Sequence, residues 1–319
     1  MKLAVREGAA ALLAGLLSVG PSAADSGGAE RASELLETMY RALRSLDYEG
    51  TLVHLQDNHL ETLHLVHRVD GGRVQERLLS LNGPVRAVTR ERDQVTCVMP
   101  DGHPIFVKSQ AGRHLLGSDR IDPGALGQRY ELLIEGAARV AGRDTDVVVI
   151  RPRDELRYGY RLHLDRASGL PLKSDLIDGL GEPIEQLMFT NLVLHRDGAD
   201  SAEAISSPAP EPASIPPQDT GRWSFEPRPA GFEPVFHDVL RGPNGAEVEH
   251  FVFSDRLSAY SIYIEPDAAE GFEGVTRIGA VHAAGRRVDG HQITAVGEVP
   301  SATVQAAVAG VRVGGAPSP

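Results

Sequence analysis

Between Tyr48 and Val107, short apolar runs alternate with two-residue turn signals such as Asp57-Asn58 and Asn82-Gly83. Turn pairs of this kind close β-hairpins. Strands joined by such short links are antiparallel, because a parallel crossover needs a dozen or more residues. The sequence therefore predicts an antiparallel meander, with strands at Tyr48–Leu55, Leu60–Val69, Val74–Leu81, Val85–Thr89, Val95–Met99 and Ile105–Val107.

The strand pattern continues through Tyr130–Ile134 and Asp146–Ile150 and is clearest at Tyr158–Asp165. In that last run apolar residues occupy every second position, which predicts a sheet with one apolar face. Upstream, Ala29–Leu46 has apolar residues at spacings of three and four, as in a helix packed on a larger surface. Whether this helix fills the apolar face or leaves an open groove stays open at this point, since both arrangements need the same residues.

A proline-rich stretch, Gly198–Gly221, divides the chain. It has almost nothing to bury, which is typical of an extended, semi-rigid tether. We therefore expect a first domain at residues 25–198, a linker at 199–221 and a second domain at 222–319. The second domain is predicted to be a small antiparallel sheet with a helix from Ser301 laid across it. Its strand candidates are Glu249–Phe253, Tyr260–Glu265, Arg277–Val288 and Gln292–Val299.

The first 24 residues have the layout of a secretory signal peptide. Lys2 and Arg6 give a positive start, Gly8–Val19 is apolar, and Ser22-Ala23-Ala24 supplies the small residues that precede a cleavage site. A membrane-spanning helix needs about 20 apolar residues, so this stretch is too short for an anchor. No cysteine lies near the cleavage point, which argues against lipoprotein attachment. We expect a soluble, exported protein.

Charge and cysteine content narrow the function classes. The formal net charge is −12 and the isoelectric point is about 5.5, so the chain has no long-range attraction for nucleic-acid phosphates. Cys97 is the only cysteine and cannot form an internal disulfide. Its place in an apolar strand pattern favours packing over reactivity.

The histidines do not have the spacing of a metal site. His64 and His67 are three apart on a predicted strand and therefore face opposite sides. Neither an HExxH motif nor a thiolate pair is present. No serine-nucleophile motif, Cys/His pair or phosphate-binding loop is complete either. We expect no catalytic activity, no cofactor and no metal.

Several segments resemble the MucB/RseB periplasmic regulators, in the same order along the chain. The resemblance covers nearly the whole chain after the predicted signal peptide, and the predicted linker falls where that family has one. In the first domain the segments are Tyr48–Thr51, Arg139–Arg143, Arg157–Leu162 and Gly169–Ser174. In the second domain they are Phe251–Asp255, Arg286–Asp289 and Val296–Pro300.

The resemblance implies a mainly β fold with some helix (α+β). Its first domain would be an antiparallel half-barrel with packed helices, similar to the lipoprotein carriers LolA and LolB, and the second a small antiparallel sheet with a helix. The implied function is negative regulation of the envelope-stress factor sigma-E in the periplasm. Such a regulator binds the periplasmic part of an anti-sigma factor of the RseA or MucA type and shields it from site-1 proteolysis. Lipopolysaccharide or lipoprotein acyl chains would be the releasing signal, and a homodimer is compatible with this role.

Two sets of residues are candidates for binding. The apolar strand faces of the first domain are the expected lipid site, with candidates Leu63, Leu65, Tyr158, Tyr160, Leu162 and Leu164. The aromatic strands of the second domain are the expected partner surface, with candidates Phe251, Phe253, Tyr260, Ile262 and Tyr263. Alternation places Tyr260 and Ile262 on one face of a strand and Tyr263 on the other, so one set can face a core and the other a partner.

A periplasmic carrier of lipids or lipoproteins is the alternative function, which the first domain alone would suggest. The second domain discriminates between the two functions, since carriers of that fold consist of one domain.

The signal-peptide interpretation predicts a mature protein that begins at or near Asp25 and carries no lipid. The reasons are the short apolar stretch, the small residues at 22–24 and the absence of a cysteine near them. Intact-mass measurement of the exported protein tests it. A mass that retains residues 1–24, or that includes an acyl group, would contradict the prediction.

Overall fold

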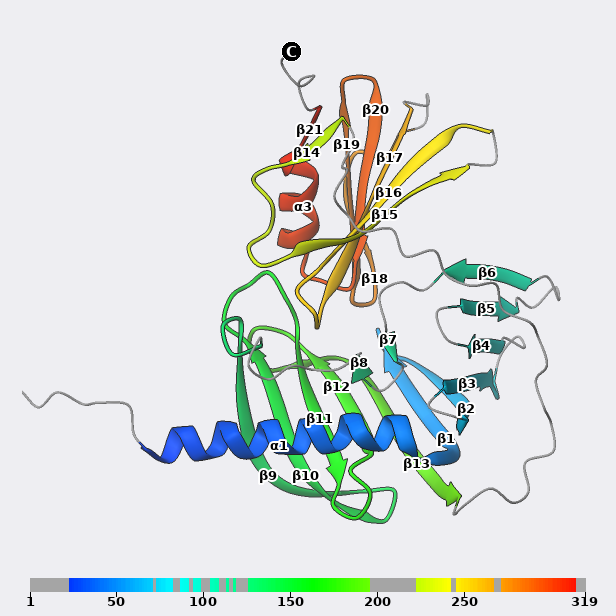
Figure 1. Cartoon of the computed structure of the whole chain (residues 1–319), viewed down its shortest axis with the longest axis vertical. Helices are drawn as coiled ribbons and strands as arrows, with labels where there is room; N and C mark the ends of the chain where they lie inside the picture. Colours follow the sequence, from blue (N-terminus) through cyan, green and yellow to red (C-terminus); the bar gives the residue numbers. More distant parts are fainter. Residues whose placement is uncertain are drawn as a thin grey trace, which may run out of the picture.

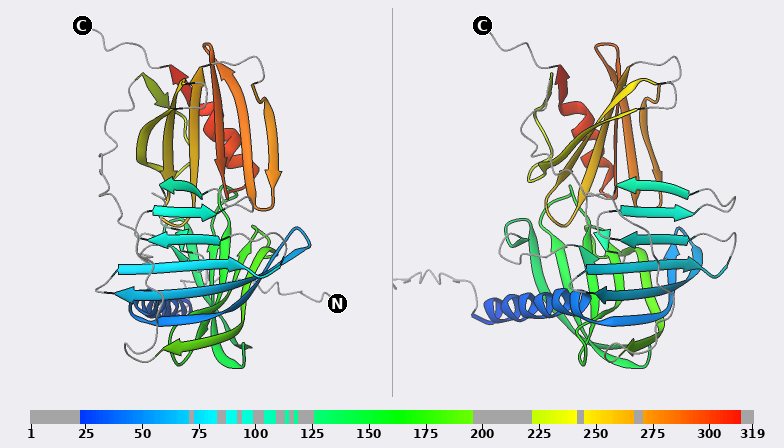
Figure 2. Two further views of the ribbon diagram at one scale, coloured as in Figure 1. Left: turned by 90° about the vertical axis from the view of Figure 1, so that its right-hand side faces the viewer. Right: turned by 45° about the vertical axis from the view of Figure 1, so that its right-hand side comes forward.

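The computed structural model describes residues 23–70, 73–82, 87–91, 94–98, 104–108, 113–114, 117–118, 126–195, 222–241, 245–266 and 271–313. Most of the predicted signal peptide, the predicted linker at 199–221 and the side chain of Cys97 lie outside the described residues. Figure 1 shows two bodies, with the first domain below and the second above. Two further views in Figure 2 show the second domain stacked on one side of the first.

The first domain is built on one 11-stranded antiparallel sheet with the order β6-β5-β4-β3-β2-β1-β13-β12-β11-β10-β9. Two meanders meet at its centre, where β1 pairs with β13. Among the described strands, the end strands β6 and β9 do not pair with each other, so the curved sheet is a half-barrel. Its strands are β1 (Asp47–Gln56), β2 (His59–Asp70), β3 (Arg73–Ser80), β4 (Ala87–Glu91), β5 (Gln94–Val98), β6 (Pro104–Lys108), β9 (Tyr130–Val140), β10 (Arg143–Pro152), β11 (Gly159–Asp165), β12 (Pro171–Ile177) and β13 (Pro183–His195).

Local sequence explains the tight hairpins of this sheet. Asp57 and Asn58 both have positive φ, 47° and 62°, which is the turn type that matches the twist of two antiparallel strands. Ala141 and Gly142 repeat this geometry between β9 and β10, at 49° and 75°. A separate two-stranded ribbon is formed by β7 (Arg113–His114) and β8 (Gly117–Ser118).

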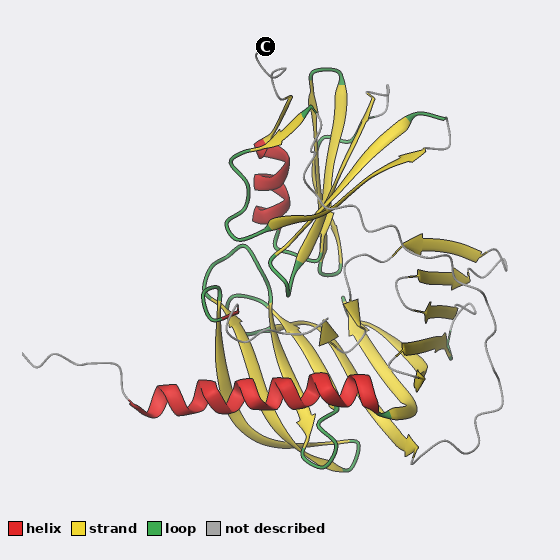
Figure 3. Ribbon diagram, in the orientation of Figure 1, coloured by secondary structure: helices red, strands yellow, loops and turns green. Residues whose placement is uncertain are grey.

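Helix α1 (Ala23–Ser45) lies across the inner face of the half-barrel, over β9 and β10, as Figures 1 and 3 show. Its buried side chains follow the predicted stripe, and they are Ala32, Leu36, Met39, Ala42 and Leu43. They form one core with residues of β9 to β12. The helix therefore fills this part of the apolar face, which resolves the alternative that the sequence left open.

The second domain is a six-stranded antiparallel sheet with the order β15-β16-β17-β20-β19-β18. Helix α3 (Ser301–Gly310) covers one face, beside the two-stranded ribbon of β14 (Trp223–Phe225) and β21 (Val311–Val313). The sheet strands are β15 (Glu233–Arg241), β16 (Glu247–Ser254), β17 (Ala259–Pro266), β18 (Gly274–Ile278), β19 (Val281–Val288) and β20 (His291–Gly297).

The predicted fold class, an antiparallel half-barrel with packed helix and a small second sheet with its helix, is confirmed. Some elements differ from the prediction. The single strand expected at Arg277–Val288 is two strands, because Gly279 takes a positive φ of 59° and turns the chain. Strands β12, β13 and β15 were not predicted, since prolines and charged residues interrupt their apolar alternation.

A buried carboxylate fixes the turn between β11 and β12 and yields a stability prediction. Asp165, whose side chain is 2% exposed, accepts hydrogen bonds from Arg143 Nη2 at 2.8 Å and from Ser168 Oγ at 2.6 Å. Burial alone would raise the pKa of Asp165, but the hydrogen bonds from Arg143 and Ser168 outweigh burial and lower it. A lowered pKa contributes stability above the unfolded-state pKa of about 4, and that contribution is lost as the pH falls through the folded-state pKa.

We expect Asp165→Asn to lower the free energy of unfolding by about 2 kcal/mol at neutral pH, because it removes charge-assisted hydrogen bonds from a buried site. Urea denaturation at neutral pH measures this loss. The difference from wild type should shrink as the pH falls below about 4 and through the lowered folded-state pKa of Asp165, because the wild-type carboxylate is then protonated as well. Asp146→Asn is the matched control, since its partner Arg166 is half exposed and such pairs contribute little. Equal stability of the two variants would contradict the prediction.

Candidate functional site

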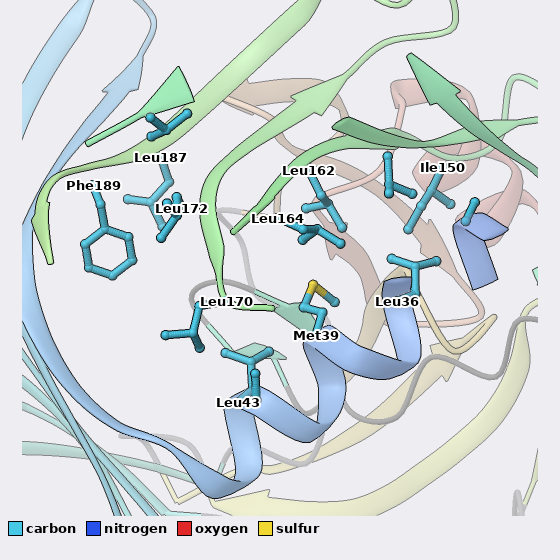
Figure 4. Packing of buried hydrophobic residues seen from close by; sticks show 14 of the residues in the cluster. Leu36, Met39, Leu43, Ile150, Leu162, Leu164, Leu170, Leu172, Leu187 and Phe189 are labelled. Atoms are coloured by element: carbon cyan, nitrogen blue, oxygen red, sulfur yellow. The ribbon is translucent and has the colours of Figure 1, made fainter. Parts of the chain in front are cut away.

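The inner face of the half-barrel carries the residues predicted to bind lipid. Leu63, Leu65, Leu162 and Leu164 are at most 6% exposed and belong to the core beneath and beside α1. Figure 4 shows Leu36, Met39 and Leu43 of α1 pointing toward this face, across from the side chains of Ile150, Leu162, Leu164, Leu170, Leu172, Leu187 and Phe189. In this structure the face is packed core, so an acyl chain would have to displace side chains that now cover one another.

Tyr158 and Tyr160, the other two lipid candidates, lie at the start of β11, toward the second domain. Tyr158 is buried against Ala280 of the second domain. Tyr160 is half-buried and contacts both this small cluster and the core under α1. These two tyrosines therefore connect the inner face with the domain interface, a position that sequence periodicity alone did not reveal.

A cavity of about 340 Å³ lies between the first turns of α1 and strand β9. Its size is at the lower end of ordinary ligand pockets. Apolar and charged groups both line it, and they are Ala29, Glu30, Ser33, Gly127, Tyr130, Glu131, Leu132, Leu133 and Arg153. None of the residues predicted to bind lipid lines this cavity.

A buried polar group interrupts the inner face near β1 to β3. His67 is fully buried, its Nδ1 lies 3.0 Å from Glu76 Oε1, and its ring stacks on Tyr48 at 4.4 Å between centroids. Burial, aided by the charge of Glu76, raises the pKa of Tyr48 well above its ordinary value, so its phenol stays neutral. Among the residues that the structure describes, Tyr48 Oη and His67 Nε2 have no hydrogen-bond partner.

Four of the five residues predicted to bind a partner belong to the core of the second domain. Phe251, Phe253, Tyr260 and Ile262 are at most 2% exposed beneath α3, where they pack with residues such as Val304. Their role here is to hold the second domain together, because α3 covers the strand face on which they lie.

Tyr263 alone lies on the opposite face of the sheet. There it stacks on His250 at 4.4 Å between centroids, and His250 in turn contacts Phe236 edge-on at 5.5 Å. All three side chains are half-buried. We call Phe236, His250 and Tyr263 the open face of the second domain. Burial lowers the pKa of His250, which favours its neutral form.

The domain interface holds functional candidates that sequence reasoning missed. Arg157, in the loop between β10 and β11, and Asp255 of the second domain are both fully buried and pair at 2.5 Å. Burial alone would lower the pKa of Arg157, but the bond to Asp154 and the charge of Asp255 outweigh it and raise the pKa. Both residues of the pair fall within segments that carry the family resemblance, which was the available signal.

Within the described residues, no group of three or more His, Cys, Asp or Glu side chains is placed to hold a metal ion. No helix in the described part of the chain is long and apolar enough to cross a membrane.

The chain matches known proteins over most of its length. A family model described as the MucB/RseB N-terminal domain matches residues 31–215, and one described as the MucB/RseB C-terminal domain matches residues 217–312. The sigma factor AlgU regulatory protein MucB of Pseudomonas aeruginosa is 32% identical over 293 residues, which are 88% of this chain and 90% of that protein. The sigma-E factor regulatory protein RseB of Escherichia coli K12 is 26% identical over 310 residues, covering 94% and 95% of the two chains.

Solved structures agree with the sequence matches. A chain in the Pseudomonas aeruginosa MucA/MucB complex has a TM-score of 0.71 and 30% identity, covering 90% of this chain and all of that one. A chain in a crystal structure of MucB in complex with MucA(peri) has a TM-score of 0.69, also at 30% identity, covering 89% and 100%. Because both family models match and together span nearly all of residues 31–312, the chain belongs to the MucB/RseB family.

Proposed function

We propose that this protein is a periplasmic negative regulator of an envelope-stress sigma factor. It would bind the periplasmic part of a membrane anti-sigma factor of the MucA or RseA type and shield that segment from the first protease. The observation that carries this proposal is the whole-chain similarity to MucB in its complex with MucA(peri), at a TM-score of 0.69 across both domains. Export by a cleaved signal peptide would place the chain in the same compartment as this partner.

The open face of the second domain supports a grip on the anti-sigma segment. Phe236, His250 and Tyr263 form a row of contacting rings across β15 to β17, in which His250 stacks on Tyr263 and meets Phe236 edge-on. Half-buried aromatic rings can bury large areas against a partner at low cost in side-chain entropy. The buried set under α3 is unavailable for such contact, so the partner surface assigned to this domain is narrowed to the open face.

Release by lipopolysaccharide or lipoprotein acyl chains is the second part of the proposal. The inner face of the first domain is apolar, and the cavity of about 340 Å³ lies at its rim beside α1. Each buried methylene contributes about 0.8 kcal/mol, so partial insertion of one chain would suffice for binding. The same features also favour the alternative function, a lipid or lipoprotein carrier. A carrier would not protect the anti-sigma segment from proteolysis, so a protection assay distinguishes the carrier from the regulator.

We expect the full chain to protect the periplasmic anti-sigma segment from site-1 proteolysis and Tyr263→Ala to weaken that protection. An interface aromatic of this kind should cost about tenfold in affinity, equivalent to about 1.4 kcal/mol. Cleavage rate as a function of regulator concentration measures it. Tyr40→Ala, which removes a half-buried tyrosine from α1, is the matched control. If the Tyr263 variant protected the segment fully and the Tyr40 variant did not, the partner-binding surface would lie on the first domain instead.

We also expect brominated palmitate to quench a tryptophan placed at position 160. Trp223→Phe removes the only native tryptophan, and Tyr160→Trp then reports from a half-buried site that contacts the inner face. An acyl chain on that face would bring bromine close to the indole and lower its fluorescence. Ser224→Trp in the same background reports from the second domain as a control. Equal quenching of both reporters, or of neither, would argue against the inner face as the lipid site.

A further inference from the structure

A buried ion pair between Arg157 and Asp255 joins the two domains. Arg157 Nη1 lies 2.5 Å from Asp255 Oδ2, and both side chains are fully buried. The other guanidinium nitrogens are occupied as well: Nη2 donates to the carbonyl oxygen of Ala230 at 2.6 Å, and Nε donates to Asp154 Oδ1 at 2.9 Å. The guanidinium of the first domain is therefore fully coordinated, with two of its three partners supplied by the second domain.

Aromatic rings from both domains enclose this pair. The guanidinium carbon lies 4.9 Å from the ring centroid of Phe232 and 5.8 Å from that of Tyr130. Tyr130 Oη donates to Asp255 Oδ2 at 2.8 Å, so one carboxylate oxygen accepts bonds from two residues of the first domain. We call Tyr130, Arg157 and Asp255 the interdomain latch.

A sealed ion pair of this kind favours two discrete arrangements over gradual sliding. Its members lose their hydration, and the mutual attraction and added hydrogen bonds offset that cost only when all partners are in place. Partial separation leaves a buried charge unpaired, whereas full separation returns both groups to water. The interface is therefore stable when docked or when opened and unfavourable between these states.

The other contacts between the domains are mixed. Leu257 of the second domain joins the core of the first domain, and Leu156 of the first packs against the core of the second. Ala280 packs against Tyr158 and Leu176, and the Gly279 N–H donates to Asp57 Oδ2 at 2.9 Å. Thr303 adds a hydrogen bond to the backbone of the β10–β11 loop. Domains joined by such mixed apolar and polar contacts move relative to each other more readily than domains joined by a large apolar interface. Within the latch, the side chains of Arg157 and Asp255 are both fully buried.

The latch borders the cavity beside α1. Tyr130 begins strand β9 and lines the cavity together with Ala29 and Ser33 of α1, while its hydroxyl bonds Asp255. The strands on either side of the Arg157 loop carry Ile150 and Leu162, which pack under α1. A ligand that displaces α1 or widens the cavity would therefore act on the residues that position the latch.

We propose that the interdomain latch couples acyl-chain binding in the first domain to the position of the second domain, with the docked, latched form being the lipid-free form. This inference rests on the lipid-release part of the proposed function. Because coupling between two sites is reciprocal, a latch that opposes lipid entry must itself be weakened by lipid. Removing the latch should then raise the affinity of the first domain for an acyl chain.

Distances between the domains test the latch without any ligand. Spin labels at Leu180→Cys in the first domain and Val239→Cys in the second, in a Cys97→Ala full chain, report the domain separation by double electron–electron resonance. Both native side chains are exposed, at 89% and 48%. We expect a narrow distribution for the parent protein and an added longer-distance population with Asp255→Asn. A distribution left narrow by Asp255→Asn would overturn the latch.

Affinity for fluorescent palmitate, below its critical micelle concentration, tests the coupling. Asp255→Asn should bind it about tenfold more tightly than wild type, within the usual range of allosteric coupling. Arg161→Gln is the control, because it removes the ion pair between Arg161 of β11 and Glu135 of β9, which lies away from the domain interface. Domains that open in Asp255→Asn without a gain in affinity would overturn the coupling.

Two further measurements distinguish failure of the latch coupling from failure of the proposed regulatory function. If Asp255→Asn fails to fold, palmitate added to the labelled parent protein should itself produce the longer-distance population, and no change would overturn the proposal. If wild type binds no palmitate, the lipid part of the proposed function and the coupling both fail. The anti-sigma part of the proposed function is tested separately, by the protection assay, and would not be affected by that result.

Discussion

The pairing of β1 with β13 is the contact on which the architecture depends. It joins the first strand of one meander to the last strand of the other, which are more than a hundred residues apart in sequence, from Asp47↔His195 to Gln56↔Glu185. Gly50 permits this approach, since an added Cβ would lie 2.3 Å from the backbone oxygen of Asn191 and 2.9 Å from the Phe189 ring. Only with this seam formed does the sheet become a single curved surface that α1 can cover. The domain interface depends on it in turn, because Asp57 and the β10–β11 loop lie on opposite sides of the seam.

Covering an apolar surface gives α1 a double role. Its stripe of Leu36, Met39 and Leu43 completes the core of the first domain, yet its first turns leave a cavity against β9. A helix with few polar ties to the sheet is held mainly by apolar contact, which has no directional preference. An acyl chain offers the same kind of contact. Helix α1 therefore stabilises the lipid-free domain through the same kind of apolar contact that a bound acyl chain could supply in its place.

Periodicity predicted much of the fold and little of the site. The alternation in Tyr158–Asp165 and the turn at Asp57-Asn58 have local causes, so β1, β2 and β11 were predicted near their observed bounds. Strand β13 begins at a proline and carries Glu185 and Gln186, and its register comes from β1 rather than from its own pattern. Alternation correctly separated Tyr263 from Tyr260 and Ile262, but it did not predict which strand face is core, because only the placement of α3 decides that. Arg157 and Asp255 are 98 residues apart, and no local pattern predicts a pair at that separation.

Strand β15, at one edge of the second-domain sheet, is poorly suited to pairing with a strand of another chain. Strand β15 is an edge strand with Val235 and Val239 about half exposed, but Pro234 lacks an N–H and a bulge lies between Pro234 and Phe236. Such interruptions break the row of backbone donors and acceptors that an added strand would need. Sheet-to-sheet fusion of two molecules is therefore disfavoured along the first part of this edge. In the proposed regulator, whose aromatic rings would face one partner, the interrupted β15 edge would limit polymerisation through its own sheet.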